Sequence, residues 1–131
     1  KKNIKIMISL IIDAASDKII FAIVNDQRSY TTSYINCREN FDNFMKLILN
    51  FLDRNKISID DINRIYVNLG PGKFTSLRLS LTIAKAISLA NKAILVGFKS
   101  QDLVNKNYKK LVKLEKKKLS IKGLIKPIYS S

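Results

Sequence analysis

The chain has 131 residues, of which 47% are hydrophobic, and it carries 24 Lys and Arg against 10 Asp and Glu, a formal net charge of +14. This length suits one domain with one hydrophobic core. Because the chain contains no histidine, Ser-His-Asp and Cys-His nucleophile systems, HExxH-type zinc sites and a histidine pH switch are excluded. The single cysteine, Cys37, excludes an intrachain disulfide and an all-cysteine metal cluster, and it suggests a reducing compartment.

The positive charge has two interpretations. It could serve binding to nucleic acid or to an anionic membrane, or it could reflect a coding sequence rich in A and T, which favours Lys, Ile and Asn. Residues 99–126 favour a ligand more strongly than the rest, since they hold ten lysines against Asp102 and Glu115. No apolar run approaches the roughly 20 residues of a membrane-spanning helix. Residues 1–16 could imitate a short signal peptide, but they are more typical of a strand, and we expect a cytoplasmic protein without a membrane partner.

The strands are predicted from short β-branched and aromatic segments. Three come in series at 5–13, 18–24 and 28–35, and two more at 64–69 and 92–98. A terminal strand at 124–129 would be confined to a sheet edge by Pro127. The first segment is almost continuously apolar, which predicts a central strand in a sheet covered on both faces, by helices or by a partner.

Helical spacing predicts helices over 39–54 and 74–91, and a basic helix over 101–118. In the first helix a stripe faces the core, with Leu47 and Phe51 beside it; the stripe consists of Phe41, Phe44, Met45, Ile48, Leu49 and Leu52. The second helix is apolar around much of its circumference, and Ser76, Ser80, Ala84 and Ser88 form a row of small residues that permits close approach of another helix. Either these are broad core-facing stripes, or the two helices are sandwiched between their own sheet and another protein.

A glycine loop, Gly70-Pro71-Gly72-Lys73, connects a predicted strand to the second helix. The helix N-terminus could hold a phosphate or carboxylate there, with Lys73 adding charge. It is not a Walker A loop, because Phe74 follows Lys73 and Val67 stands where the first glycine belongs. The alternative is a tight turn that lets the helix pack on the sheet. Asp13 likewise has two interpretations, a metal or nucleotide ligand and a strand-end turn residue; the Ala14-Ala15 that follows lacks the glycine that lets a phosphate approach.

Three motifs taken together are more specific than any one of them: Gly70-Pro71-Gly72-Lys73-Phe74-Thr75-Ser76-Leu77-Arg78-Leu79-Ser80, Ala84-Lys85-Ala86 and Gly97-Phe98-Lys99-Ser100. They resemble the segments G-P-G-S-F-T-G-L-R-I-G, A-K-G and G-V-S-S of the TsaB (YeaZ) family. The resemblance covers roughly the first hundred residues. Ser76 and Ser80 replace two family glycines and Lys73 replaces a serine, so a nucleotide-binding role for the loop is further in doubt.

The resemblance implies an α/β fold of the actin-like ATPase (ribonuclease H-like) type, with a mixed five-stranded sheet flanked by helices. Family members are longer, with a second actin-like subdomain. Residues 1–98 would then be the N-terminal subdomain, and residues 99–131 a basic helix and terminal strand remaining from a second subdomain that is largely absent. Residues 125–129 resemble the closing P-x-Y-L-R segment of the family.

The resemblance also implies a function. The family is the catalytically silent paralogue of the TsaD/Kae1 proteins and, with TsaD and TsaE, supports threonylcarbamoylation of the adenosine next to the anticodon in tRNA. We therefore expect a non-catalytic subunit, without cofactor or metal, that pairs with a TsaD-like enzyme and reaches a TsaE-like ATPase and tRNA through the complex; a homodimer is possible when the chain is alone. The expected partner contacts are Phe44, Leu47, Phe51, Leu77, Leu81, Ala84 and Lys85. The expected loop motif consists of Gly70, Pro71, Gly72, Phe74, Thr75 and Arg78.

Two alternatives remain open. The first is a nucleic-acid-binding module in which Lys116, Lys117 and Lys118 contact tRNA phosphates, with an affinity that falls steeply with salt. The second is an actin-like enzyme that hydrolyses ATP, which calorimetry with ATP and magnesium would test. The first alternative is compatible with the scaffold role.

Overall fold

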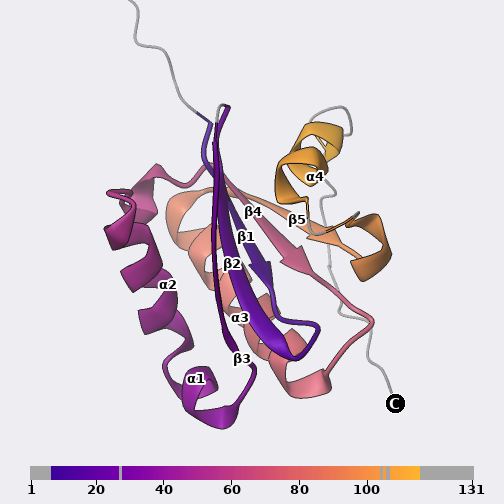
Figure 1. Cartoon of the computed structure of the whole chain (residues 1–131). Helices are drawn as coiled ribbons and strands as arrows, with labels where there is room; N and C mark the ends of the chain where they lie inside the picture. Colours follow the sequence, from indigo (N-terminus) through magenta and orange to yellow (C-terminus); the bar gives the residue numbers. More distant parts are fainter. Residues whose placement is uncertain (1–6, 27, 104, 106, 116–131) are drawn as a thin grey trace, which may run out of the picture.

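The fold is a five-stranded mixed sheet with helices on both faces (Figure 1). The computed structural model describes residues 7–26, 28–103, 105 and 107–115. In chain order these form β1 (Ser9–Asp13), β2 (Lys18–Val24), β3 (Ser29–Ile35), α1 (Arg38–Asp42), α2 (Phe44–Arg54), β4 (Arg64–Asn68), α3 (Phe74–Asn91), β5 (Ile94–Phe98) and α4 (Tyr108–Glu115), with short 3-10 turns at Ile59–Asp61 and Ser100–Asp102.

The strands lie in the order β3-β2-β1-β4-β5. β1 pairs with β2 antiparallel and with β4 parallel, and β4 pairs with β5 parallel. All five residues of β1 are buried, because strands flank it on both sides and helices cover both faces. The predicted central strand, the mixed sheet and the α/β class are therefore confirmed.

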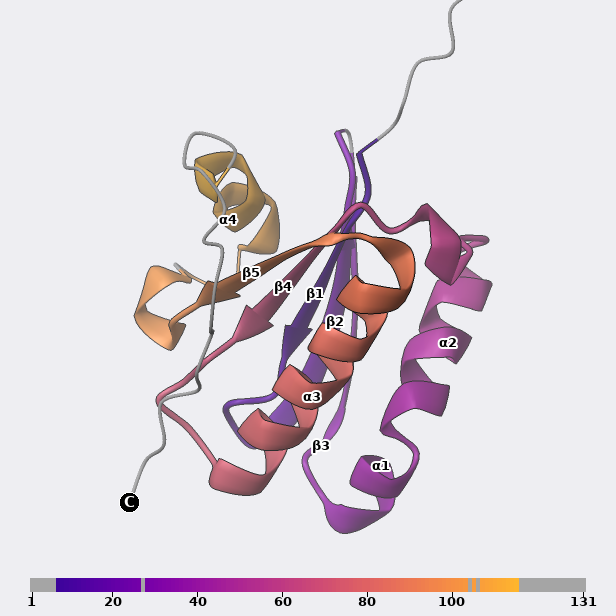
Figure 2. The ribbon, with the colours of Figure 1, turned by 180° about the vertical axis from the view of Figure 1, so that it is seen from behind.

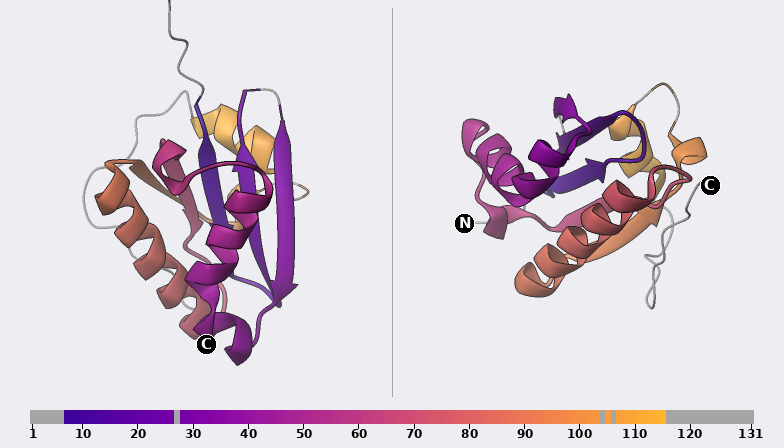
Figure 3. Two further views of the ribbon diagram at one scale, coloured as in Figure 1. Left: turned by 90° about the vertical axis from the view of Figure 1, so that its left-hand side faces the viewer. Right: turned by 90° about the horizontal axis from the view of Figure 1, so that it is seen from below.

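Two hydrophobic clusters cover the two faces of the sheet. α2 and α3 run side by side over one face, where Phe44 and Ile48 of α2 pack in the same cluster as Leu81 of α3 (Figure 2). α4 covers the opposite face, where Tyr108, Leu111 and Val112 pack against β-strand residues that include Tyr66 and Phe98 (Figure 3). This two-sided coverage explains why β1 could be almost entirely apolar.

The predicted helix over 39–54 is interrupted, and this part of the prediction was wrong. α1 ends at Asp42 and α2 begins at Phe44. Asn43 between them has φ −111° and ψ 16°, and its side-chain amide donates to the carbonyl of Glu39 at 3.0 Å. Asn side chains compete in this way for backbone groups and favour helix ends, which the apolar periodicity does not reveal.

The row of small residues on α3 packs on the chain's own sheet. Ser76, Ser80 and Ala84 are fully buried, and the Ser80 hydroxyl donates to the Leu77 carbonyl at 3.0 Å. The small side chains thus let α3 lie close to the strands beneath it, so these three positions are not available to a second helix from another molecule. α3 ends at Asn91, and the next residue, Lys92, adopts a left-handed conformation with φ 55°.

The basic helix begins later than predicted, at Tyr108 instead of Gln101. Residues 100–102 form a 3-10 turn in which the Lys99 amide donates to Asp102 Oδ2 at 2.9 Å. Asn107 directly precedes α4, and its side-chain oxygen accepts from the Lys110 amide at 3.0 Å. Residues 116–118 and the predicted strand at 124–129 lie outside the described residues. Across the described ranges, no helix has the length and apolar character needed to cross a membrane.

Candidate functional site

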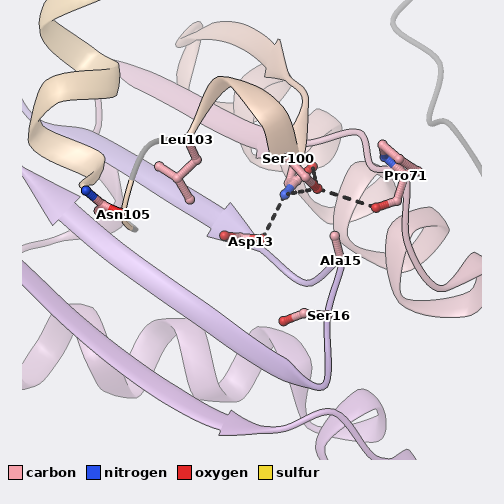
Figure 4. Close-up of a pocket in the computed structure, with 8 residues that line it drawn as sticks. Asp13, Ala15, Ser16, Pro71, Ser100, Leu103 and Asn105 are labelled. Atoms are coloured by element: carbon pink, nitrogen blue, oxygen red, sulfur yellow. Dashed lines mark hydrogen bonds between the residues drawn. The ribbon is translucent and has the colours of Figure 1, made fainter.

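Polar side chains gather where β1, β4 and β5 end. These three strands are mutually parallel, so their carboxyl ends meet at the same edge of the sheet, the usual place for ligand sites in α/β folds. Asp13 ends β1, Asn68 ends β4 and Ser100 follows β5; Tyr108 approaches from α4. We call these four residues the carboxyl-end cluster; Asp13 and Ser100 are labelled in Figure 4.

Asp13 is the acceptor at the centre of the carboxyl-end cluster. It is 2% exposed, and its Oδ1 accepts from the Asn68 side-chain amide at 2.9 Å. Its Oδ2 accepts from the Tyr108 hydroxyl at 2.7 Å. Burying a carboxylate is costly unless hydrogen bonds satisfy it, and here neutral donors engage both oxygens. Asp13 therefore ties β1 to β4 and to α4.

Tyr108 completes this arrangement as a permanent donor. Its side chain is buried, and the pKa of its hydroxyl is raised well above the usual range, chiefly by burial and further by the neighbouring Asp13 carboxylate. Loss of the phenol proton would place a second negative charge beside the carboxylate. The hydroxyl thus remains protonated and donates to Asp13 throughout the physiological pH range.

The glycine loop is packed against the turn that follows β1. Gly70 has φ 99°, a conformation that favours glycine, and its amide donates to Asn68 Oδ1 at 2.7 Å. A Cβ on Gly72 would collide with the carbonyl oxygen of Ala15, and the Lys73 amide donates to that same oxygen at 3.3 Å. Lys73 also forms an exposed ion pair with Asp17 at 3.0 Å. The loop therefore has the geometry of a tight packing turn, the second of its two interpretations.

The glycine loop and the turn after β1 are in contact at Gly72 and Ala15. A cavity of about 300 Å³ opens between these segments and the chain after β5 (Figure 4). Its lining consists of Asp13, Ala15, Ser16, Asn68, Pro71, Ser100, Leu103 and Asn105. Within the described residues no group of three or more His, Cys, Asp or Glu side chains could hold a metal ion. Asp13 lines the cavity, and both of its carboxylate oxygens accept hydrogen bonds from within the chain.

The remaining loop-motif residues extend onto the start of α3. Phe74 is 47% exposed, and the Arg78 guanidinium lies over its ring, 5.1 Å from the centroid. Thr75 and Pro71 are exposed as well. The motif thus has two parts, a glycine turn that packs inward and a helix start that faces outward.

Most of the residues expected to contact a partner lie in the core of the chain itself. Phe44, Phe51, Leu77, Leu81 and Ala84 are at most 5% exposed, so no second protein can contact them while this fold is intact. Phe51 approaches Phe21 of β2, with 6.5 Å between the ring centroids. Only Leu47 and Lys85 of the expected contacts are half-buried. The helix faces that the sequence analysis assigned to the partner are thus mostly the faces that pack on the sheet.

The exposed side of α3 carries very little charge. Its exposed residues are Phe74, Arg78 and five uncharged ones that we call the α3 outer face: Thr75, Thr82, Ala86, Leu89 and Ala90. Leu89, a large apolar side chain, is 83% exposed. On α2, Leu49 is 43% exposed. The lysines expected to contact nucleic acid, Lys116, Lys117 and Lys118, lie outside the described residues.

Two members of the carboxyl-end cluster were not expected from the sequence. Asn68 lies at a strand end two residues before Gly70, and this placement was the available signal. Tyr108 carried no signal, because it is 95 residues away from Asp13 in the chain and looks like one more amphipathic position of a basic helix. Ser100 was noted only as part of the motif that follows β5.

Comparisons with known proteins agree on one family. The family model for TsaD, tRNA N6-adenosine threonylcarbamoyltransferase, matches residues 18–110. The tRNA threonylcarbamoyladenosine biosynthesis protein TsaB of Buchnera aphidicola subsp. Schizaphis graminum (strain Sg) is 32% identical over 98 residues, covering 74% of this chain and 46% of the relative. TsaB of Escherichia coli (strain K12) is 27% identical over 88 residues, 67% of this chain and 38% of the relative. The chain therefore spans less than half the length of these curated relatives.

Solved structures support the fold. YeaZ from Pseudomonas aeruginosa superposes with a TM-score of 0.70 at 16% identity, covering 78% of this chain and 48% of the other. The RuvC protein of T. thermophilus in complex with a Holliday junction has a TM-score of 0.50 at 12% identity, over 92% of this chain and 83% of the other. These likenesses agree with the ribonuclease H-like sheet order described above. On the match to the family model and the identity to TsaB proteins, this chain belongs to the TsaB (YeaZ) family.

Proposed function

We propose that this chain is a non-catalytic subunit that binds a TsaD-like enzyme and supports threonylcarbamoylation of the adenosine next to the anticodon in tRNA. Support for the pathway comes from the relatives, which are named as tRNA threonylcarbamoyladenosine biosynthesis proteins. Support for a role without catalysis comes from the carboxyl-end cluster, where Asp13 is engaged by Asn68 and Tyr108. In this proposal catalysis, and the contacts with tRNA and a TsaE-like ATPase, belong to the complex.

The α3 outer face is the observation that carries the proposed partner contact. A helix with one side in water normally presents charged residues there, yet Arg78 and Lys85 are the only charges between Phe74 and Asn91. Thr82, Ala86 and Ala90 are small, so the backbone of a partner helix could approach closely. Leu89 offers an apolar side chain that loses its contact with water on binding.

α2 extends this proposed contact on the same side of the molecule. Both helices lie side by side over one face of the sheet (Figure 2). Leu49 on α2 is 43% exposed, and Leu47 and Lys85 are half-buried. A pair of helices from a TsaD-like protein could pack on these two helices as a four-helix arrangement. The proposed contact surface thus keeps the two helices expected from the sequence and moves the contact to their outward residues.

Co-expression tests this proposal. The chain is produced with the TsaD-family protein of the same genome, and the complex is measured by size-exclusion chromatography with light scattering. We expect a one-to-one complex that Leu89→Lys abolishes, because the substitution places a charge within the proposed contact. Ser33→Lys is the matched control, since it adds the same charge at an exposed position on β3. Absence of the complex with both proteins folded, or a complex that Leu89→Lys leaves intact, contradicts the proposed surface.

A further inference from the structure

β3 is an edge strand without the usual protection against pairing. It forms one end of the sheet order β3-β2-β1-β4-β5. Its seven residues, Ser29–Ile35, pair with β2 in an unbroken register and contain no charged residue, no proline and no glycine. Natural edge strands are commonly short, or interrupted by lysine, proline or a bulge, because an open row of backbone groups otherwise pairs with another strand. β3 is therefore accessible to an incoming strand.

The hydrogen bonds at the two ends of β3 show which of its backbone groups point outward. The Asn25 amide donates to Arg28 O at 3.0 Å, and the Asn36 amide donates to Asp17 O at 2.9 Å. Both bonds join residues directly opposite one another in the β2–β3 register. In an antiparallel ladder such pairs alternate, so the even-numbered residues from 28 to 36 direct their backbone groups toward β2. The backbone groups of Ser29, Thr31, Ser33 and Ile35 therefore point away from the sheet.

The middle of this outward row is open. The Ile35 carbonyl accepts from the Cys37 amide at 3.0 Å and from the Asn40 side chain at 2.7 Å, which closes that end of β3. Among the described residues, no hydrogen bond reaches the outward backbone groups of Thr31 or Ser33. Each of these two residues can donate and accept one backbone hydrogen bond with an incoming strand.

A hollow lies on each face of the sheet beside this open stretch, since β3 runs between α2 and α4 (Figure 1). The α2-side hollow has a volume of about 480 Å³ and is lined in part by Arg54. The α4-side hollow has a volume of about 620 Å³ and is lined in part by Lys18 and Tyr108. Thr31 and Thr32 line both. The two hollows thus border the stretch of β3 whose backbone groups are open.

An added strand would direct its side chains alternately into the two hollows. Tyr30 and Tyr34 pack in the hydrophobic cluster on the α2 face. Since side chains alternate along a strand, Thr32 shares that face, whereas Thr31 and Ser33 face α4. Residues directly opposite one another in an antiparallel pair put their side chains on the same face. A residue opposite Thr32 therefore reaches the α2-side hollow, and its neighbours reach the α4-side hollow.

Both hollows favour acidic side chains. The α2-side lining contains one charged residue, Arg54, and the α4-side lining contains one, Lys18; among the described residues no Asp or Glu lines either. Both basic side chains are exposed. Arg54 donates to the Tyr34 hydroxyl at 3.2 Å, and its guanidinium carries further N–H groups that can pair with a carboxylate. The net charge of +14 also attracts an acidic ligand from a distance.

We propose that β3 is a docking edge for an extended acidic segment of another protein, which adds to the sheet as an antiparallel strand beside β3. Its backbone pairs with Thr31 and Ser33. One of its carboxylates reaches Arg54 in the α2-side hollow, and the next reaches Lys18 in the α4-side hollow. In this mode of recognition the backbone hydrogen bonds supply affinity and the side-chain hollows supply specificity.

Charge and hydrogen bonding disfavour two other occupants of this edge. Residues 1–6 and 116–131 of the chain itself carry three and five lysines, respectively, and no Asp or Glu, so they would meet Arg54 and Lys18 with the same sign of charge. A single-stranded nucleic acid has anionic phosphates, but its phosphate backbone has no donor for the open carbonyl groups of Thr31 and Ser33. An acidic peptide strand satisfies both the charges and the backbone groups.

Fluorescence anisotropy with synthetic peptides tests the docking edge. The acidic peptide is fluorescein-Thr-Val-Glu-Glu-Val-Thr-amide, whose adjacent glutamates point to opposite faces of a strand. A matched peptide carries Gln in place of both glutamates. We expect the full chain to bind the acidic peptide roughly tenfold more tightly than the Gln peptide. Because salt screens the charge pairs, this difference should shrink as salt is added.

Arg54→Gln and Lys18→Gln test the two hollows. Each variant removes one positive charge from one hollow, and each should weaken binding of the acidic peptide about threefold. Lys46→Gln is the matched control, because it removes the same charge from an exposed position on α2 that lies outside both linings. It should bind as the parent chain does. Equal losses in all three variants would mean that net charge alone attracts the peptide, which overturns the proposal.

Thr31→Pro tests the backbone pairing. It removes an outward amide and leaves the ladder to β2 intact, because the Thr31 amide does not point toward β2. We expect binding of the acidic peptide to fall at least roughly tenfold, with an unchanged circular dichroism spectrum. Should this variant fail to fold, Ser33→Glu against Ser33→Lys decides the question: the first should weaken binding by repulsion, and the second should bind at least as tightly as the parent chain. Equal effects of these two substitutions overturn the proposal.

Three further results would overturn the proposal. The first is a parent chain that binds neither peptide, or both equally. The second is a uridylate hexanucleotide that binds more tightly than the acidic peptide and is weakened by the same variants, which assigns the edge to nucleic acid. The third is self-association in sedimentation equilibrium that Thr31→Pro abolishes. Leu89→Lys should bind the acidic peptide as the parent chain does, so the result does not depend on the proposed TsaD contact.

Discussion

The carboxyl-end cluster and the α3 outer face differ in how completely their groups are satisfied. In the cluster, Asp13 is buried and hydrogen-bonded to Asn68 and Tyr108. On the α3 outer face, Leu89 is 83% exposed. The first region resembles a ligand site by its place in the fold, but its groups are used to connect strands and helix. The second has no reactive group, yet it leaves a large apolar side chain exposed. The contrast predicts that substitutions in the cluster reduce stability and that substitutions on the α3 outer face alter association only.

The largest loss of stability should follow from Asp13→Leu. This substitution removes the acceptor of two buried hydrogen bonds. The Asn68 amide and the Tyr108 hydroxyl then each lose their acceptor on Asp13 while they remain in the core. Each orphaned donor costs roughly 1–3 kcal/mol, so the free energy of unfolding should fall by about 4 kcal/mol. Guanidinium denaturation followed by circular dichroism measures this. A loss below about 1 kcal/mol would mean that the cluster does not connect the strands as described.

Tyr108→Phe should have the next largest effect. It keeps the ring in the core and removes only the hydroxyl that donates to Asp13 at 2.7 Å. Hydrogen bonds to charged groups contribute roughly 1.5–3 kcal/mol, and we expect a loss of about 2 kcal/mol in the same denaturation measurement. Tyr30→Phe is the matched control, because within the described part of the chain its hydroxyl accepts from the exposed Arg28; it should change stability by less than about 0.5 kcal/mol.

Gly72→Ala tests the contact between the glycine loop and Ala15. The added Cβ collides with the Ala15 carbonyl oxygen and backbone, so one of the two segments must shift. Overpacking of this kind typically costs 1–3 kcal/mol, and we expect about 1.5 kcal/mol. Lys73→Ala, which removes only an exposed ion pair with Asp17, should cost less than about 1 kcal/mol. Equal losses in the two variants would argue against a packing role for Gly72.

Alkaline pH should lower the free energy of unfolding of the parent chain more than that of the Tyr108→Phe variant. The pKa of Tyr108 is raised in the folded state, so above about pH 10 the unfolded chain releases a proton that the folded chain retains. Stability from this group is complete below that pH and declines above it, by at most about 1.4 kcal/mol per pH unit. Denaturation at pH 9 and pH 11 should therefore show the stability difference between the two proteins shrinking. A constant difference would mean that Tyr108 titrates normally.

The smallest effect on stability should come from Leu89→Ser. Because this side chain is 83% exposed, its loss from the folded chain should alter the free energy of unfolding by less than about 0.5 kcal/mol. The same variant should weaken binding to a TsaD-like protein at least tenfold in titration calorimetry, because the apolar contact is lost. A variant that unfolds readily would place Leu89 in the core and remove the contrast between the two regions.

Local sequence patterns were sufficient to predict much of the fold. The bounds of β2 and α3 were predicted as observed, Lys18–Val24 and Phe74–Asn91. Each is a single periodic segment between turn residues, and its periodicity alone separates strand from helix. The break at Asn43 was missed because a side-chain hydrogen bond to Glu39 made it, while the apolar spacing continues across it.

The candidate sites were harder to predict, because they depend on which face of a helix meets the sheet. Phe51 was placed beside the core stripe and in fact packs near Phe21. One residue turns a helix by about 100°, which is enough to move a side chain from the edge of the buried face to its centre. The Asp13–Tyr108 contact joins residues 95 positions apart, and nothing local to either residue encodes it. From the sequence, Asn68 and Ser100 could be identified only as residues at or just after the ends of predicted strands.

The hydrogen bond between Asp13 and Tyr108 has a consequence for the order of folding. Asp13 meets Asn68 across 55 residues and Tyr108 across 95. A contact between distant residues costs the conformational entropy of the long chain segment between them. Such contacts therefore tend to form after elements that are nearer in the sequence have assembled. During synthesis the ribosome makes all five strands before it makes α4. The sheet can thus assemble first, and α4 then docks on a completed surface, where Tyr108 supplies the last donor to Asp13.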